Sequence, residues 1–149
     1  MAMPTRNLGL DLMRATEAAA LASARYVGRG DKEGGDRAAV EAMRLLLNSL
    51  DFRGRVVIGE GEKDKAPMLY NGEVLGQGEG PLWDLAVDPV EGTRLLALGR
   101  PGAISVIAAA PEGTLFNPGP AFYAAKLVVG PEAKEAIDLK ASVADNLKE

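Results

Sequence analysis

The stretch Asp84-Leu85-Ala86-Val87-Asp88-Pro89-Val90-Glu91-Gly92-Thr93 decides the architecture of this chain. Its apolar run between acids is typical of a buried strand in a layered α/β sheet. Pro89 begins a turn that leads the chain out of this strand, and a short helix is expected after Thr93, ending near Gly99. Two acids, Asp88 and Glu91, therefore follow a strand directly.

A second strand of the same kind is predicted upstream. The run Arg55-Val56-Val57-Ile58-Gly59 is β-branched and ends in glycine, which is the pattern of another buried strand. Acids follow it as well, at Glu60, Glu62 and Asp64. If the two strands are neighbours, their carboxyl ends meet at one edge of the sheet and the acids share one pocket, because open α/β sheets bind ligands at that edge.

Two helices are predicted before these strands. Thr5 or Asn7 can cap the first helix, which continues to about Tyr26 with alanine-rich turns. The glycine-rich stretch 28–35 is expected to be a loop, and the second helix is expected to start at about Asp36. The apolar face of that second helix comprises Ala39, Val40, Met43, Leu46, Leu47 and Leu50.

The remaining segments complete an α/β pattern. Residues 65–83 are expected to be irregular, with a possible hairpin around Asn71-Gly72. Two more strands are predicted at 103–110 and 121–129, and the residues after Pro131 are expected to be helical or irregular. The predicted fold class is therefore α/β, with two leading helices followed by a mixed sheet.

Composition excludes several kinds of chemistry. The chain has 149 residues, which fits one domain of ordinary size, and it contains no Cys and no His. Thiolate nucleophiles, imidazole bases and Cys/His zinc sites are therefore excluded within it. The net charge of −4 argues against a nucleic-acid partner, and no apolar run is long enough to span a membrane. A cytoplasmic location is the expectation.

The grouped carboxylates favour a metal site. Acids packed together raise one another's pKa values unless a cation lies between them. Mg²⁺ and Mn²⁺ prefer oxygen ligands and leave positions open for water and phosphate oxygen. The competing interpretation is that these acids are merely solvated loop residues, as most charged residues are.

The six residues from Asp88 to Thr93 resemble the Asp-Pro-(Ile/Leu/Val)-(Asp/Glu)-Gly-Thr signature of the lithium-sensitive, metal-dependent phosphatase superfamily. This superfamily includes inositol monophosphatases and fructose-1,6-bisphosphatases. The chain also resembles the bacterial class II fructose-1,6-bisphosphatases over almost its whole length, through the segments 28–32, 58–62, 66–70 and 126–131. The resemblance implies the layered α/β sugar-phosphatase fold.

Site residues follow from this resemblance by position. The resemblance implies metal ligands at Asp36, Glu60, Asp88 and Glu91, and sugar-bisphosphate contacts at Glu91, Gly92, Thr93 and Tyr123. Thr93 matches the hydroxyl that lies beside the attacking water, and Asp64 matches an acid that assists the proton transfer. One extra residue near Pro118-Gly119-Pro120 departs from the family pattern just before Tyr123.

The implied activity is that of a phosphoric monoester hydrolase. It removes the 1-phosphate of fructose 1,6-bisphosphate in gluconeogenesis, with Mg²⁺ or Mn²⁺ as cofactor. The alternatives are a sedoheptulose-1,7-bisphosphatase, an inositol-phosphate phosphatase, or a catalytically silent module that binds metal or sugar phosphate or serves in assembly. Family members are about twice as long, so residues 1–149 are expected to be an N-terminal metal- and substrate-binding domain, incomplete at its C-terminus. A homodimer or homotetramer is expected.

Overall fold

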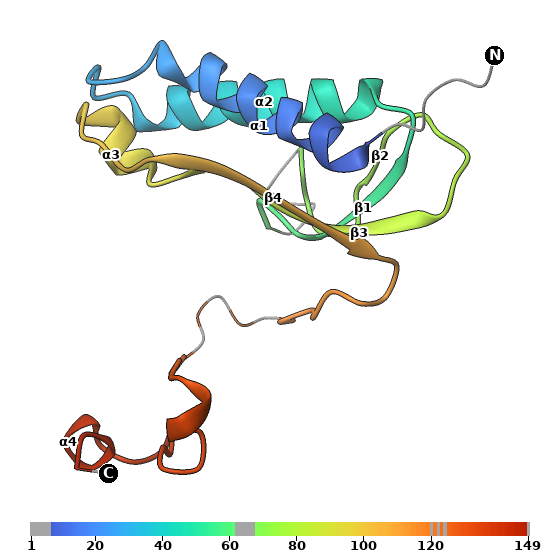
Figure 1. Ribbon diagram of the computed structural model, residues 1–149. Coiled ribbons are helices and arrows are strands. Elements are labelled where there is room, and N and C mark those ends of the chain that lie inside the picture. Colours follow the sequence, from blue (N-terminus) through green and yellow to red (C-terminus); the bar gives the residue numbers. More distant parts are fainter. Residues whose placement is uncertain (1–6, 62–67, 120, 122, 124, 149) are drawn as a thin grey trace. The chain divides into compact units, whose positions relative to one another are not determined.

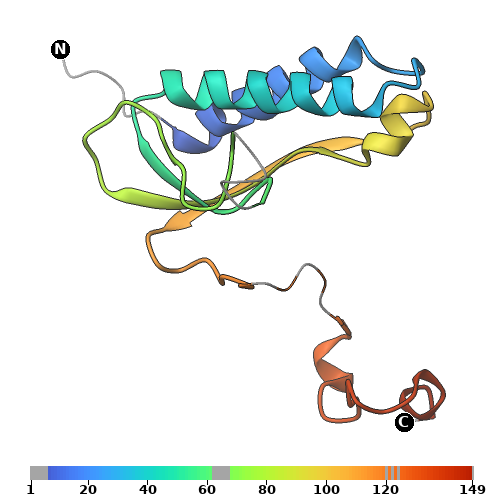
Figure 2. The same ribbon diagram turned by 180° about the vertical axis from the view of Figure 1, so that it is seen from behind.

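The computed structural model describes residues 7–61, 68–119, 121, 123 and 125–148. The chain divides into two units, Met1–Asn117 and Pro118–Glu149. The first unit has two layers, in which a pair of helices lies along one face of a sheet (Figures 1 and 2). The predicted fold class, two leading helices followed by a mixed sheet, is confirmed for this unit.

The helical layer is an antiparallel pair formed by α1 (Leu8–Ala24) and α2 (Lys32–Ser49). Asn7 caps α1, because its side-chain oxygen accepts a hydrogen bond from the Leu10 N–H at 3.3 Å. The other predicted cap, Thr5, lies outside the described residues. Small residues allow the helices to approach closely, and Ala15, Ala19 and Ala39 are fully buried. No helix in the described part of the chain combines the length and the hydropathy of a membrane span.

The predicted start of the second helix at Asp36 is wrong, because α2 begins four residues earlier. Asp31 caps it, with its carboxylate accepting the Gly34 N–H at 2.8 Å. Gly34 and Gly35 are helical, and they are needed for packing rather than for a turn. A Cβ at Gly35 would lie 2.6 Å from Leu96 Cδ2 and 3.2 Å from Tyr26 Cβ, so a larger residue would force these side chains to shift. Asp36 therefore lies inside α2 and not at its N-terminus.

The sheet has the strand order β2-β1-β3-β4. Both predicted acid-bearing strands are present as β1 (Arg53–Ile58) and β3 (Leu82–Glu91), and they are parallel neighbours. The short strand β2 (Val74–Leu75) follows the predicted turn at Asn71-Gly72 and pairs antiparallel with β1. β4 (Ile104–Pro111) confirms the predicted strand at 103–110 and pairs antiparallel with β3.

β3 extends further than the sequence suggested. The chain was expected to turn out of the strand from Pro89, yet β3 continues to Glu91. Pro89 is tolerated because the β3–β4 register shifts between Asp88 and Glu91, so three steps along β3 match two along β4. The predicted short helix follows as α3 (Thr93–Ala97), which Gly92 precedes with a φ of 87°.

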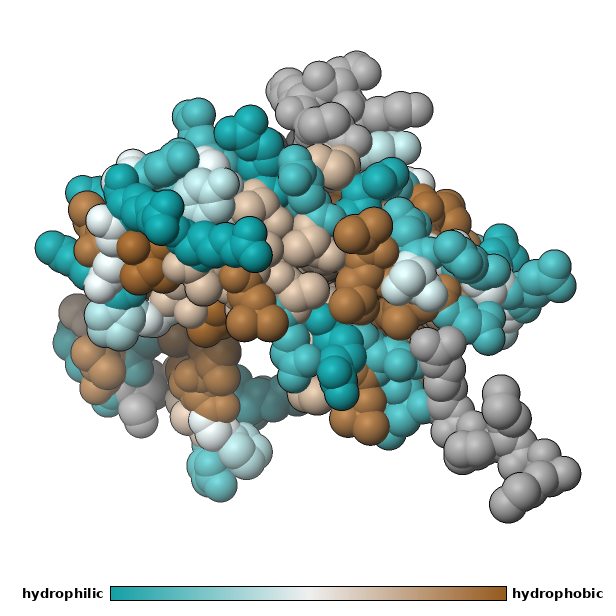
Figure 3. All heavy atoms as spheres, turned by 90° about the horizontal axis from the view of Figure 1, so that it is seen from above, coloured by the Kyte–Doolittle hydropathy of each residue, from teal (hydrophilic) through white to brown (hydrophobic). Residues whose placement is uncertain are grey.

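The core lies between the helices and the sheet. Its largest fully buried apolar side chains are Met43, Leu47, Leu69, Leu75, Leu85 and Val56. The outer surface of the helical layer also carries apolar side chains between the polar ones, as the view from above shows (Figure 3). Leu21 and Leu45 are the most exposed apolar residues on α1 and α2, at 73% and 76%.

Among its described residues, the second unit contains two short elements, η1 (Pro131–Ala133) and α4 (Val143–Asn146). The predicted strand at 121–129 is wrong for the described residues of that range, none of which is assigned to a strand. Leu127, Val128 and Val129 are 43%, 91% and 39% exposed. A β-branched run becomes a strand only where a neighbouring strand accepts its hydrogen bonds, and none pairs with these residues here.

Candidate metal centre

Three elements carry the four carboxylates predicted as metal ligands. β1 and β3 are parallel neighbours with Ile58 opposite Ala86, so Glu60 and Asp88 each lie two residues beyond that pair at the same edge of the sheet. Asp36 comes from α2, which packs on the sheet, and Glu91 is the last residue of β3. The predicted neighbouring of the two strands is therefore confirmed, and their acid-bearing ends lie at one edge of the sheet.

The pKa of Glu60 reflects the nearby acids. Burial raises its pKa, and the negative charges of Asp36 and Asp88 raise it further, to about 7. Both neighbours therefore act on Glu60 from separate elements.

Asp88 and Asp36 belong to the same electrostatic group. Burial raises the pKa of Asp88, and the hydrogen bond and negative charge of Glu91 add to this effect, to about 6. The pKa of Asp36 is also raised by burial, while Lys32 on the same helix opposes the shift. No ion pair within the described residues joins any of these four carboxylates to a Lys or Arg.

The shift in register brings Asp88 and Glu91 together. Side chains alternate between the two faces of a strand, so residues three apart in a regular strand point to opposite faces. The irregularity between Asp88, which pairs with Val106, and Glu91, which pairs with Ile104, breaks this alternation. Their carboxyls can therefore share a hydrogen bond.

The donor chemistry of this acidic group suits a hard divalent cation. All four side chains offer carboxylate oxygen, the ligand that Mg²⁺ and Mn²⁺ favour. The raised pKa values of Asp36, Glu60 and Asp88 show that their negative charges are only weakly compensated by the protein itself. As placed within the described residues, no three acidic side chains come close enough to ligate one ion. The set fits a cation by chemistry and charge, and its ligand role stays a prediction.

The structure says less about where the remaining predicted site residues lie relative to these carboxylates. Glu91, Gly92 and Thr93 are consecutive, and they join the end of β3 to the start of α3. Glu62 and Asp64 lie outside the described residues. Tyr123 belongs to the second unit, where its side chain is 96% exposed.

Sequence reasoning missed the residues that support Glu60. Glu73 is buried at 5% exposure, accepts the Leu69 N–H at 2.5 Å and pairs with Arg44 of α2 at 2.6 Å. Leu69 in turn accepts the backbone N–H of Glu60 at 2.9 Å. These residues lie in or contact a stretch that was expected to be irregular, and a lone Glu between glycines gives no periodic signal.

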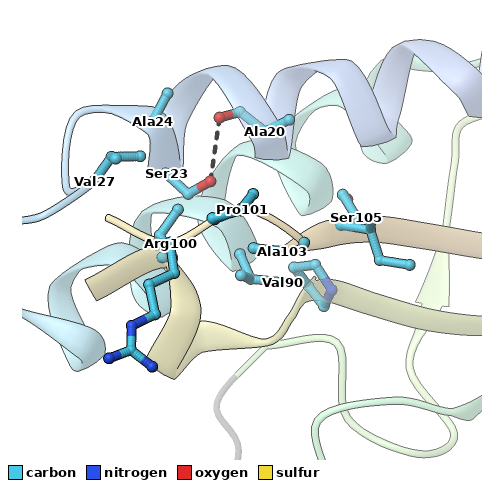
Figure 4. A pocket seen from close by; sticks show the side chains of 13 residues that line it. Ala20, Ser23, Ala24, Val27, Val90, Arg100, Pro101, Ala103 and Ser105 are labelled. Carbon is cyan, nitrogen blue, oxygen red and sulfur yellow. Dashed lines mark hydrogen bonds between the residues drawn. The ribbon is translucent and has the colours of Figure 1, made fainter. Parts of the chain in front are cut away.

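A cavity of about 260 Å³ is lined in part by Pro89 and Val90, the two residues between Asp88 and Glu91. It is formed where the end of α1 faces the segment from Arg100 into β4, and small or apolar side chains such as Ala20, Val90 and Ala103 line it (Figure 4). Ser23 satisfies its hydroxyl on the Ala20 carbonyl at 3.1 Å. The Ser105 hydroxyl is buried without a partner in the described structure. None of the four predicted metal ligands lines this cavity.

Comparison with known proteins gives one consistent result. The family model described as "Bacterial fructose-1,6-bisphosphatase, glpX-encoded" matches residues 6–149. The chain is 51% identical over 143 residues to fructose-1,6-bisphosphatase 1 class 2 of Escherichia coli strain K12. The class 2 fructose-1,6-bisphosphatases of Escherichia coli O6:H1 and Shigella flexneri show the same identity. Each match covers 96% of this chain and 42% of the relative, so the chain spans less than half the length of these relatives.

Proposed function

The chain belongs to the bacterial fructose-1,6-bisphosphatase family, and on that premise we propose that the whole protein hydrolyses fructose 1,6-bisphosphate. The products are fructose 6-phosphate and inorganic phosphate. Water supplies the oxygen that attacks the phosphorus of the 1-phosphate, and the bond from phosphorus to the sugar oxygen breaks. One proton leaves the water, and one is taken up by the departing sugar oxygen.

One observation carries this proposal, namely the group of carboxylates where β1, β3 and α2 meet. Asp36, Glu60 and Asp88 have raised pKa values because they are half-buried beside one another, which costs free energy in the absence of a cation. We assign Asp36, Glu60, Asp88 and Glu91 as the residues that hold Mg²⁺ or Mn²⁺. When bound, such a cation screens the negative charge of the substrate phosphate and of the departing oxygen.

The substrate is expected to lie at the turn between β3 and α3. Glu91, Gly92 and Thr93 form this turn, and Gly92 has the left-handed φ of 87° that a glycine adopts without strain. We propose that the Thr93 hydroxyl orients the attacking water, that the backbone of Gly92 approaches the sugar phosphate, and that Tyr123 contacts the sugar. Asp64 is proposed to assist the proton transfer.

The first experiment measures phosphate release by the whole protein. Fructose 1,6-bisphosphate, sedoheptulose 1,7-bisphosphate and inositol monophosphate are compared with Mg²⁺ or Mn²⁺ present. We expect turnover of fructose 1,6-bisphosphate, and we expect Asp88→Ala and Glu91→Ala to lower kcat/KM at least about 100-fold. Glu41→Ala is the matched control, because Glu41 is an exposed acid on the same helix as Asp36.

The outcomes separate the alternatives. Turnover of another ester without fructose 1,6-bisphosphate would replace the proposed substrate. Activity unchanged by both substitutions would remove the proposed site. A parent protein that binds Mn²⁺ in calorimetry but releases no phosphate from any of the three esters would instead identify a binding module.

The remaining features of the proposal concern the whole protein. We propose that it acts in the cytoplasm as a homodimer or homotetramer, with a small sugar bisphosphate as its partner and a role in gluconeogenesis. Residues 1–149 would then form the N-terminal metal- and substrate-binding portion. The apolar side chains exposed on the helical layer, Leu21 and Leu45 among them, support self-association. Light scattering of the purified protein tests this assembly.

A further inference from the structure

The chain contains a buried carboxylate that lies outside the predicted site but is joined to it. Glu73 precedes β2 and is 5% exposed. One of its oxygens accepts from Arg44 Nε at 2.6 Å, and the other accepts from the Leu69 N–H at 2.5 Å. Both carboxylate oxygens therefore accept a hydrogen bond, one from Arg44 of α2 and one from Leu69 in the segment before β2.

Leu69 has an unusual backbone conformation that this carboxylate holds in place. Its φ is 53°, in the left-handed region that residues other than glycine rarely adopt, and its side chain is fully buried. A residue in this conformation persists when its surroundings fix it. The charged hydrogen bond from Leu69 N–H to Glu73 provides such a contact.

The carbonyl of Leu69 then fixes the backbone of Glu60. It accepts the Glu60 N–H at 2.9 Å, while Asn71 holds the residues on either side of Glu60. The Asn71 side chain accepts the Gly59 N–H at 3.0 Å, and its own N–H donates to the Gly61 carbonyl at 2.9 Å. The fit is tight, because a Cβ at Gly59 would lie 2.1 Å from the Leu69 oxygen.

We propose that Glu73, held by Arg44, is a positioning residue for Glu60 and thereby sets the affinity of the acidic site for a divalent cation. This inference rests on the proposed function, in which Glu60 is a metal ligand. The chain of contacts runs from Arg44 through the Glu73 carboxylate and the Leu69 peptide to the Glu60 N–H. Arg44 and Asp36 lie on the same helix, so α2 supplies one ligand directly and supports another.

A second buried pair provides a matched control. Asp84 is 1% exposed and pairs with Arg55 at 3.0 Å, and its other oxygen accepts the Gly113 N–H at 2.7 Å. It resembles Glu73 in burial, in its arginine partner and in holding a backbone N–H. Its backbone contacts are to Gly113 and Leu115, which follow β4. Arg55, its side-chain partner, lies five residues before Glu60 without touching the backbone of Glu60 in any hydrogen bond of the described residues.

The test compares Glu73→Gln with Asp84→Asn in the whole, metal-stripped protein. A glutamine at 73 cannot satisfy both donors, because its NH₂ would face the guanidinium or the Leu69 N–H. We expect the Kd for Mn²⁺, measured by titration calorimetry, to rise about tenfold in Glu73→Gln. We expect it to change less than about twofold in Asp84→Asn, although both variants lower Tm. At saturating Mn²⁺, kcat and the KM for the sugar bisphosphate should return towards the parent values in Glu73→Gln.

Arg44 supplies a second route to the same test if Glu73→Gln folds poorly. Its side chain is 38% exposed, so Arg44→Gln disturbs the core less. We expect Arg44→Gln to weaken Mn²⁺ binding, and we expect Arg44→Lys, which keeps the charge, to restore most of the affinity.

Two failures are distinguishable by including Glu60→Gln. If the parent does not bind Mn²⁺, or if Glu60→Gln binds it as tightly as the parent, the proposed metal site fails and this inference fails with it. If Glu60→Gln loses affinity while Glu73→Gln and Arg44→Gln behave like Asp84→Asn, only the positioning role is overturned.

Discussion

Among single side chains, Glu60 combines burial with two acidic neighbours in a way that affects stability as well as function. Its pKa of about 7 in the fold lies well above the usual 4.5. Between these two values the folded chain binds more protons than the unfolded chain. Unfolding therefore becomes easier as pH rises through this window when no cation is present.

A neutral side chain at position 60 removes this dependence. We expect Glu60→Gln to match the parent at about pH 4.5 and to gain stability relative to it as pH rises to 7. The gain should be about 1 kcal/mol at pH 8, after allowance for solvent screening of a half-buried group. Urea unfolding of the chain in chelator, from pH 5 to pH 8, measures it.

The control for this experiment is Glu41→Gln, at an exposed acid on α2. Its stability difference from the parent should not vary with pH. A constant difference for Glu60→Gln across the same range would contradict the electrostatic coupling between Glu60, Asp36 and Asp88.

The acids at the strand ends could be predicted from sequence because each follows a recognisable apolar run, whereas Asp36 was expected to open a helix and instead lies inside α2. Glu60 and Asp88 stand just past short buried strands, and parallel pairing of those strands brings their ends together. Glu73 could not be predicted in this way. Its importance comes from a left-handed backbone at Leu69 and from an arginine 29 positions away in the sequence, and neither leaves a local pattern.

Among helices and strands, the start of α2 was predicted four residues too late because two glycines indicated a loop. Gly34 and Gly35 look like the end of a loop, but they allow Tyr26 and Leu96 to pack against the first turns of α2. Glycine weakens a helix by backbone entropy, so this end depends on its cap. That cap is the Asp31 carboxylate on the Gly34 N–H.

Loss of this cap should destabilise the fold. We expect Asp31→Ala to lower the free energy of unfolding by about 1 kcal/mol, because the Gly34 N–H loses its partner. Asp31→Asn should keep most of the stability, since asparagine caps about as well as aspartate. Denaturant unfolding followed by circular dichroism measures both variants. Equal stability of Asp31→Ala and the parent would show that packing alone fixes the start of α2.

The strand predicted at 103–110 is confirmed and the one predicted at 121–129 is wrong, for a physical reason. β4 forms because β3 pairs with it along most of its length, whereas the apolar residues between 121 and 129 have no paired strand in the described structure. Propensity favoured both segments equally. A strand forms only beside another strand that pairs with it, and a local sequence pattern does not show whether that strand is present.

For the complete fold, the sequence predicted the layers but not the order of the strands. Apolar runs with acidic ends indicated an α/β sheet after two leading helices, and in the structure the two helices cover one face of that sheet. The position of β2 on the far side of β1 could not be predicted, because only two residue pairs define it. The long connection between β1 and β3 therefore returns across the sheet without a helix of its own among the described residues.

This parallel pairing of β1 with β3 also has a kinetic consequence. Glu60 and Asp88 meet only after a long loop has closed, and such non-local contacts form late and slowly. A cation that needs both acids would then bind after the rate-limiting step. At a Mn²⁺ concentration about 100 times its Kd, unfolding should slow about 100-fold while the folding rate changes less than about threefold. Stopped-flow measurements with and without Mn²⁺ test this, and equal acceleration of folding would mean that the acids meet before the barrier. The metal would thus prolong the life of the native state without hastening its formation.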